Sequence, residues 1–112
     1  MTVPSRPLAL PQGTLDLLIL RTLASGPSHG YAVARTIELT TGDALRVEEG
    51  SLYPALHRLQ QRGHVAARWA QSELGKRVKV YELTARGRRE LASRQADWGQ
   101  LTDAVAKVLG MD

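Results

Sequence analysis

The sequence contains no cysteine and no phenylalanine, and its aromatic residues are limited to two tryptophans and three tyrosines. The absence of cysteine excludes disulfide bonds and thiolate metal sites, and it favours a reducing, cytoplasmic setting. No apolar run approaches the roughly 20 residues needed to span a bilayer. The first residues also lack the apolar segment of a secretory signal peptide. We therefore expect a soluble, cytoplasmic protein that does not associate with membranes.

No arrangement of side chains in the sequence predicts a metal site or a catalytic site. The three histidines, His29, His57 and His64, are separated by 28 and 7 positions, which match no local pair of metal ligands. Ser51, His57 and Asp43 are residue types found in hydrolase triads, but the strand-turn-helix motif that exposes a nucleophilic serine is missing. We therefore expect neither an enzyme nor a bound metal or cofactor.

Positive charge is concentrated in one part of the chain. The formal net charge is only +4, from 15 Lys and Arg against 11 Asp and Glu. Residues 57–94 hold ten of these cations and three of the acids, which leaves five cations and eight acids elsewhere. A local positive field is typical of a surface that contacts nucleic acid. The length of 112 residues predicts one small domain, whose limited core favours oligomerisation.

The first part of the sequence predicts a flexible arm and a helix that is buried on two sides. Residues 1–13 contain three prolines, which disfavour regular structure and indicate an extended arm. A helix is then expected from Thr14, which would cap it. Its main buried face has helical spacing and consists of Leu15, Leu18, Ile19, Thr22 and Leu23. A second apolar stripe of Leu17, Leu20 and Ala24 lies nearly opposite, and one short chain has few elements to cover both.

Two further helices and a hairpin are expected before residue 84. A break at residues 25–28 precedes a helix over residues 31–40, and a third helix starts near Glu49 or Gly50, with Pro54 close to its first turn. Residues 65–69 and 78–83 are rich in valine and aromatic residues and predict two strands, joined by a polar loop that contains Gly75. This order predicts a winged helix-turn-helix over residues 14–83, in the mainly α (α+β) class.

The exposed side of the third helix favours DNA binding over an ordinary solvated surface. Such a surface is usually rich in Glu and Lys, whereas this helix combines side chains that hydrogen-bond to bases and phosphates and has no acid within it. The exposed set is Ser51, Tyr53, Pro54, His57, Arg58 and Gln61. Lys76, Arg77 and Lys79 in the hairpin are either a solvated turn or phosphate contacts, and the basic residues that open the final helix favour phosphate contact.

Residues 84–112 predict a C-terminal dimerisation helix, with Thr84 as its cap. Its apolar residues follow heptad spacing and are Leu91, Trp98, Leu101, Val105 and Val108. A tryptophan at such a position is usually a core residue. Two copies of Trp98 that meet near a symmetry axis would also form a flat aromatic surface for a planar effector, so both interpretations stay open.

Three segments together resemble the PadR family of transcriptional regulators. The segments are GTLDLLILRTLASGPSHGYAVARTIE, VEEGSLYPALHRLQQRGHV and KVYELTARGRREL, and the resemblance runs from about Gln12 to Leu109. The single C-terminal helix resembles the compact subgroup of the family. The segments TLDLLILRTL and VEEGSLYPAL are similar to its acidobacterial-type branch.

The resemblance implies a homodimeric repressor that binds a roughly palindromic operator and is often released by a small aromatic effector. The positions implied to contact DNA are Tyr31, Ser51, Tyr53, Pro54, Lys76 and Arg77. The final helix is implied to pack over the partner's first helix, which would cover the stripe formed by Leu17, Leu20 and Ala24. A winged-helix module that binds an acidic protein, without sequence-specific DNA binding, is the alternative hypothesis.

Overall fold

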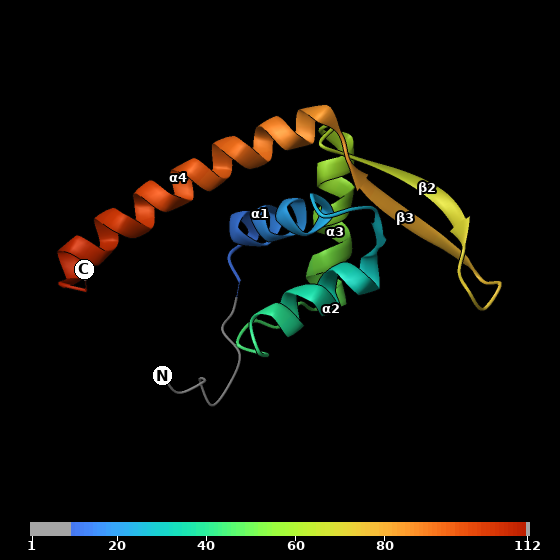
Figure 1. Cartoon of the computed structure of the whole chain (residues 1–112), viewed down its shortest axis with the longest axis horizontal. Helices are drawn as coiled ribbons and strands as arrows, with labels where there is room; N and C mark the ends of the chain where they lie inside the picture. The colour runs from blue at the N-terminus through green and yellow to red at the C-terminus, as the bar shows by residue number, and fades with distance from the viewer. Residues whose placement is uncertain (1–9, 112) are drawn as a thin grey trace.

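A computed structural model describes residues 10–111 of the chain, except for the side chain of Gln12 (Figure 1). Most of the predicted arm, residues 1–9, lies outside the described residues. The elements in chain order are α1 (Gln12–Leu23), β1 (Ser28–His29), α2 (Gly30–Thr40), α3 (Glu49–Gln61), β2 (Val65–Gln71), β3 (Arg77–Leu83) and α4 (Ala85–Leu109). No helix in this part of the chain is both long and apolar enough to cross a membrane.

Helix α1 lies at the centre of the molecule and contacts α2, α3, α4 and β3. It begins two residues earlier than expected, after Pro11, so Thr14 lies inside its first turn and the predicted Thr14 cap is wrong. Leu20 is 0% exposed within the single chain, which contradicts its assignment to a dimer surface. The neighbouring elements of the same chain already bury it, whereas Leu17 and Ala24 are only half-buried.

The sheet has the strand order β1-β3-β2, and both pairs are antiparallel. Val65 of β2 pairs with Leu83 of β3, and the register continues to the pair Gln71 and Arg77 at the outer end. Strand β1 was not predicted from the sequence, because its two residues pair with β3 more than fifty positions away, Ser28 with Tyr81. The hairpin of β2 and β3 projects from the body of the molecule as a wing (Figure 1).

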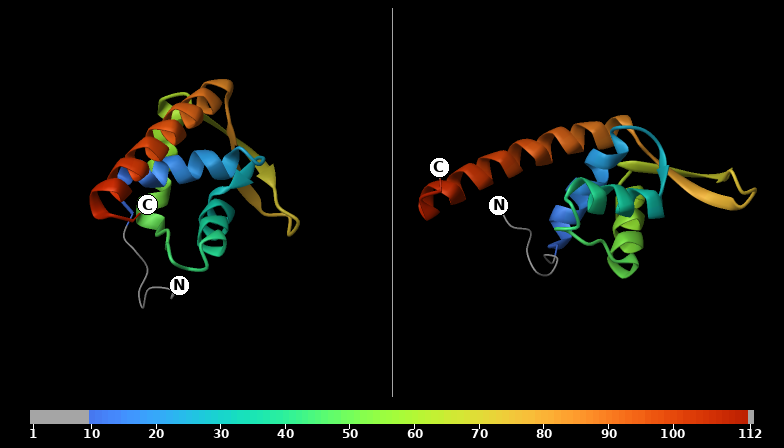
Figure 2. Two further views of the ribbon diagram at one scale, coloured as in Figure 1. Left: turned by 60° about the vertical axis from the view of Figure 1, so that its left-hand side comes forward. Right: turned by 60° about the horizontal axis from the view of Figure 1, so that its bottom comes forward.

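Helix α4 begins against the core and ends far from it (Figure 2). The Thr84 side chain accepts a hydrogen bond from the Gly87 backbone N–H at 2.9 Å, which confirms the predicted cap. Leu91 is buried in the core of its own chain, so its assignment to the dimer surface is also wrong. The last four predicted contact residues, Trp98, Leu101, Val105 and Val108, are all exposed.

Candidate nucleic-acid interface

Helix α3 presents a polar, exposed side opposite a buried apolar side. Leu52, Ala55, Leu56 and Leu59 are buried and fix the helix against the core, as their helical spacing predicts. The exposed positions that point away from the core include four of the predicted DNA contacts: Ser51, Tyr53, Pro54 and His57. This side of α3 is therefore free to enter a DNA groove.

The start of α2 holds Tyr53 in place. A Cβ atom on Gly30 would lie 2.9 Å from Cε1 of the Tyr53 ring, so only a glycine lets the ring pack this closely against α2. His29 caps the same helix, and its Nδ1 accepts a hydrogen bond from the Ala32 N–H at 3.3 Å. Tyr31, in the first turn, is exposed beside this contact. The two tyrosines therefore reach the same surface from two helices.

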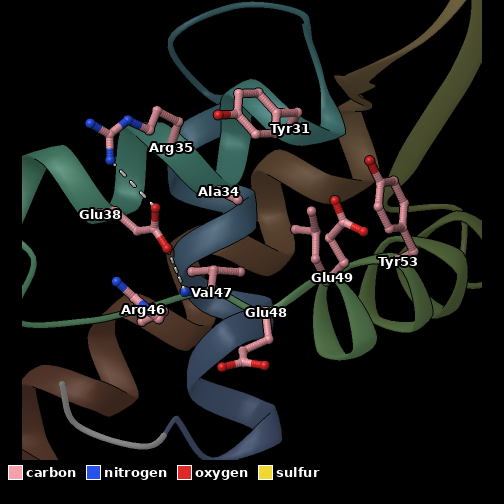
Figure 3. A pocket seen from close by; sticks show the side chains of 10 residues that line it. Tyr31, Ala34, Arg35, Glu38, Arg46, Val47, Glu48, Glu49 and Tyr53 are labelled. Carbon is pink, nitrogen blue, oxygen red and sulfur yellow. Dashed lines mark hydrogen bonds and ion pairs between the residues drawn. The ribbon is translucent and has the colours of Figure 1, made fainter. Parts of the chain in front are cut away.

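A pocket of about 330 Å³ separates these tyrosines (Figure 3). Glu49 points between Tyr31 and Tyr53 in this view. Glu38 accepts a hydrogen bond from the Val47 N–H at 3.0 Å, which ties α2 to the segment before α3. Because α3 starts at Glu49, the expectation that the helix contains no acid is wrong. A carboxylate here can accept a hydrogen bond from the amino group of cytosine, and it also repels phosphates.

Arg58 does not belong to the exposed, base-contacting surface that the sequence predicted. Its Nη2 atom donates a hydrogen bond to Oδ1 of Asp16 at 3.1 Å. Asp16 lies on the buried side of α1, and its side chain is 3% exposed. Arg94 of α4 lies 3.9 Å from the other carboxylate oxygen and also pairs with Glu90 at 2.6 Å. Arg58 thus joins α3 to α1, and Asp16 extends this link to α4 through Arg94, which corrects the assignment of Arg58 as a base contact.

The three histidines have unrelated environments, and no group of residues able to hold a metal ion occurs among residues 10–111. His29 is the cap of α2, and His57 is exposed on α3. His64 is buried, and its Nδ1 has no hydrogen-bond partner. Burial is the main cause that lowers the pKa of His64; the nearby Glu90 opposes this effect, and the guanidinium of Arg86 adds to it. The neutral ring is therefore favoured at this position.

The wing carries the predicted cations at its outer end. Lys76 and Arg77 are exposed, and Lys79 is half-buried. The loop of residues 72–76 is shorter than expected, because both strands extend beyond their predicted ends. Its geometry is fixed by a hydrogen bond from the Ser72 N–H to the Lys76 carbonyl at 2.7 Å and by Gly75, whose φ of 78° favours glycine. The short loop holds the cations close to the paired strands.

Three helices packed on one core, an exposed third helix and a basic two-stranded wing define a winged helix-turn-helix protein of the DNA-binding class. The chain matches the sequence profile of the Transcriptional regulator PadR-like family over residues 19–93, and it belongs to that family. Members of the family are DNA-binding transcriptional regulators and not enzymes.

Solved structures of similar chains have the same architecture. A transcriptional regulator from Clostridium thermocellum is 27% identical, with a TM-score of 0.79, and the match covers 86% of this chain and 93% of that one. A PadR family regulator from Eggerthella lenta is 33% identical, with a TM-score of 0.75, and the match covers 90% of this chain and 86% of that one.

A similar sequence is that of Uncharacterized protein X of Lysinibacillus sphaericus. It is 24% identical over 94 residues, which is 84% of this chain and 86% of that protein.

Proposed function

We propose that this regulator is a homodimeric repressor that binds a roughly palindromic operator. The observation that carries the proposal is the apolar stripe of Trp98, Leu101, Val105 and Val108, which is exposed on the half of α4 that extends away from the core. A second copy packed on this stripe would remove it from water and set two recognition helices at a fixed spacing. The segments TLDLLILRTL and VEEGSLYPAL also support placement in the acidobacterial-type branch.

Within each half-site, α3 reads the major groove through Ser51, Tyr53, Pro54 and His57, and Tyr31 contacts DNA from α2. The wing cations Lys76, Arg77 and Lys79 hold phosphates. Leu17, half-buried on α1, and the stripe on α4 form the dimer surface. Trp98, which is exposed at the start of the stripe, provides a flat ring on which a small aromatic effector can stack between the two copies.

The experiment that tests DNA regulation is a mobility-shift titration with the DNA just upstream of the protein's own coding region, followed by selection from a random duplex library. Enrichment of a two-fold symmetric sequence supports the proposal. Absence of retention on both DNAs at moderate salt, together with capture by an acidic protein partner, would favour the interaction-module hypothesis.

The wing cations are expected to supply affinity without sequence preference. Replacing Lys76 and Arg77 together with alanine should weaken binding alike to operator and random DNA that have the same flanking sequence. The slope of log affinity against log salt concentration should flatten by about 0.9 for each phosphate that the variant no longer neutralises. Fluorescence anisotropy across a salt series measures both effects. The control removes two exposed cations that are not part of the wing, Arg21 and Lys107; an equal change of slope in that variant would contradict the assignment.

Tyr53 is expected to contribute specificity. Tyr53→Ala should lower the ratio of operator affinity to random-DNA affinity by about tenfold or more, within the range of about 1–3 kcal/mol for removal of one base-reading side chain. Competition titrations with the selected operator and random duplexes measure this ratio. Tyr53→Phe keeps the ring against Gly30 and removes only the hydroxyl, so it separates the contribution of the hydroxyl to binding from that of ring packing. Equal losses on the two DNAs would assign Tyr53 to general affinity instead.

The apolar stripe of α4 is expected to determine the oligomeric state. Leu101→Asp with Val105→Asp should convert the dimer to a monomer, because four charges would face one another across the proposed interface. Light scattering after size exclusion gives the mass directly. Ala96→Asp with Gln100→Asp places the same added charge and the same spacing on exposed positions outside the stripe. A dimer in both variants, or a monomer in both, would contradict the interface.

A further inference from the structure

Trp69 is a large apolar side chain that the wing exposes to solvent. Its exposed fraction is 56%, although it lies in the middle of a paired strand. Trp69 pairs directly with Lys79, and Arg77 pairs with Gln71 two residues further out. Directly paired side chains share one face of a sheet, and so do residues two apart on one strand. Trp69, Arg77 and Lys79 therefore lie on a single face of the wing.

On this face, each cation lies over an aromatic ring. The guanidinium carbon of Arg77 is 4.5 Å from the centroid of Trp69, and Nζ of Lys79 is 5.8 Å from the centroid of Tyr81. A contact of this kind at an exposed site contributes about 0.5–1 kcal/mol. The planar guanidinium is thus held on the indole face, and its N–H donors keep a restricted set of directions. This preorders an otherwise flexible cation at the outer end of the wing.

The face continues inward to the recognition helix. The Tyr53 ring packs against Gly30, and Gly30 directly follows β1, whose Ser28 pairs with Tyr81 of β3. Burial raises the pKa of Tyr81, and Tyr53 adds to this rise. From Tyr53, this face passes over the buried ring of Tyr81 and the half-buried Lys79 to the exposed Trp69 and Arg77. A partner that contacts the exposed side of α3 can therefore extend along the same face of the wing.

The charge around Trp69 identifies the partner as an anionic polymer. The hairpin is positively charged overall: it contains four cations, Arg68, Lys76, Arg77 and Lys79, and two acids, Glu73 and Glu82. An apolar protein surface would leave these cations desolvated without counter-charges, whereas the sugar-phosphate backbone offers both an apolar sugar surface and flanking phosphates. In the proposed complex, the duplex that contacts α3 would present its sugars and its phosphates to the wing as well.

We propose that Trp69 and Arg77 act together as a minor-groove contact, in which the indole packs against the deoxyribose wall and directs the stacked guanidinium into the groove. The inference rests on the proposed operator binding and refines one part of it: Lys76 and Lys79 hold phosphates, whereas the guanidinium of Arg77 enters the groove. A narrow minor groove has enhanced negative potential and is a property of A·T-rich tracts. The pair therefore gives the protein a preference for A·T-rich sequence in the flanks of its operator, outside the bases that α3 contacts.

The test separates this role from charge alone, because Trp69→Ala removes no charge. Wild type, Trp69→Ala and Leu74→Ala are each used to select duplexes from one random library, and the A·T content of the flanks is compared. Leu74 is the matched control, since it is 85% exposed on the same wing and, unlike Trp69, is not an aromatic ring that could hold a cation. Trp69→Phe retains a ring beneath Arg77.

Trp69→Ala is expected to lose the flank preference and about tenfold in affinity for A·T-flanked duplex, with an unchanged salt slope. Leu74→Ala should behave as wild type, and Trp69→Phe should recover most of the preference. The difference in tryptophan emission between wild type and Trp69→Phe isolates Trp69, because both proteins contain Trp98; this difference signal should change on addition of the selected duplex.

Two results would overturn the inference. If wild type enriches an operator but Trp69→Ala selects the same flanks with the same affinity as Leu74→Ala, Trp69 does not contact DNA, and operator binding itself stands. If Trp69→Ala lowers affinity equally for A·T-rich and G·C-rich flanks, the ring has no role in groove recognition. Failure of the wild type to enrich any duplex would instead contradict the proposed function as a whole.

Discussion

Replacing Gly87 with alanine is expected to destabilise the folded protein strongly. A Cβ atom at this position would lie 2.0 Å from the backbone carbonyl oxygen of His64 and 2.8 Å from a methyl group of Leu83. The nearer atom belongs to the backbone, so rotation of a flexible side chain cannot relieve the clash. Gly87 lies in the first turn of α4, and the clash would push the helix away from the start of β2.

The hydrogen bonds around Gly87 make this displacement costly. The Thr84 hydroxyl donates to the Gly63 carbonyl at 2.7 Å and accepts from the Gly87 N–H at 2.9 Å. The Thr84 N–H donates to the His64 carbonyl at 3.2 Å. Moving α4 outward would stretch or break these hydrogen bonds, which connect the end of the wing to the start of the long helix. Overpacking usually costs about 1–3 kcal/mol, and we expect a cost of about 3 kcal/mol or more here, a large part of the stability of a small domain.

Urea denaturation followed by circular dichroism measures the effect of Gly87→Ala. The matched control is Gly99→Ala in the same helix, where a Cβ atom would meet nothing within 4 Å. Because alanine is the better helix former, Gly99→Ala should stabilise the protein by up to about 1 kcal/mol. A Gly87 variant as stable as wild type would mean that α4 does not approach the His64 carbonyl this closely.

The sequence pattern predicted most elements because they follow from local rules. The apolar spacing of α3 and the valine-rich strands are visible within a window of a few residues, and Thr84 was recognised as a cap from its position. Leu20 shows where local rules end. Periodicity identifies both apolar faces of α1, but only the packed chain shows that its own elements bury Leu20.

The errors at the candidate site have the same origin. Arg58 has the residue type and the spacing of a DNA contact, yet its partner Asp16 is 42 positions away and on another helix. An aspartate within the apolar segment LDLLIL was the one available signal, since a buried acid requires a cation. Trp69 was interpreted only as a strand residue, because its exposure and its stacking on Arg77 depend on how far the wing projects.

Neutralising Asp16 is the second change with a large expected effect. Asp16→Asn keeps the size of the side chain but removes the negative charge that faces Arg58 and Arg94. Breaking a buried ion pair from one side typically costs about 3–5 kcal/mol, because the remaining charge is buried without compensation. We expect about 3 kcal/mol, at the low end of this range, because the two guanidiniums are about one quarter exposed and Arg94 retains Glu90.

The matched control is Asp43→Asn, which neutralises the exposed member of the 3.9 Å pair with Arg35. Asparagine tolerates the φ of 64° at this position, and exposed pairs contribute at most about 1 kcal/mol. Urea denaturation gives the free energy of unfolding of both variants. Equally small losses would show that the Asp16 carboxylate contributes no more to stability than an exposed ion pair. A double variant, Asp16→Leu with Arg58→Leu, should recover much of the stability that Asp16→Asn removes, since it replaces both members of the ion pair with apolar side chains. Such recovery would place the cost in the separation of Arg58 from Asp16, at the junction of α1, α3 and α4.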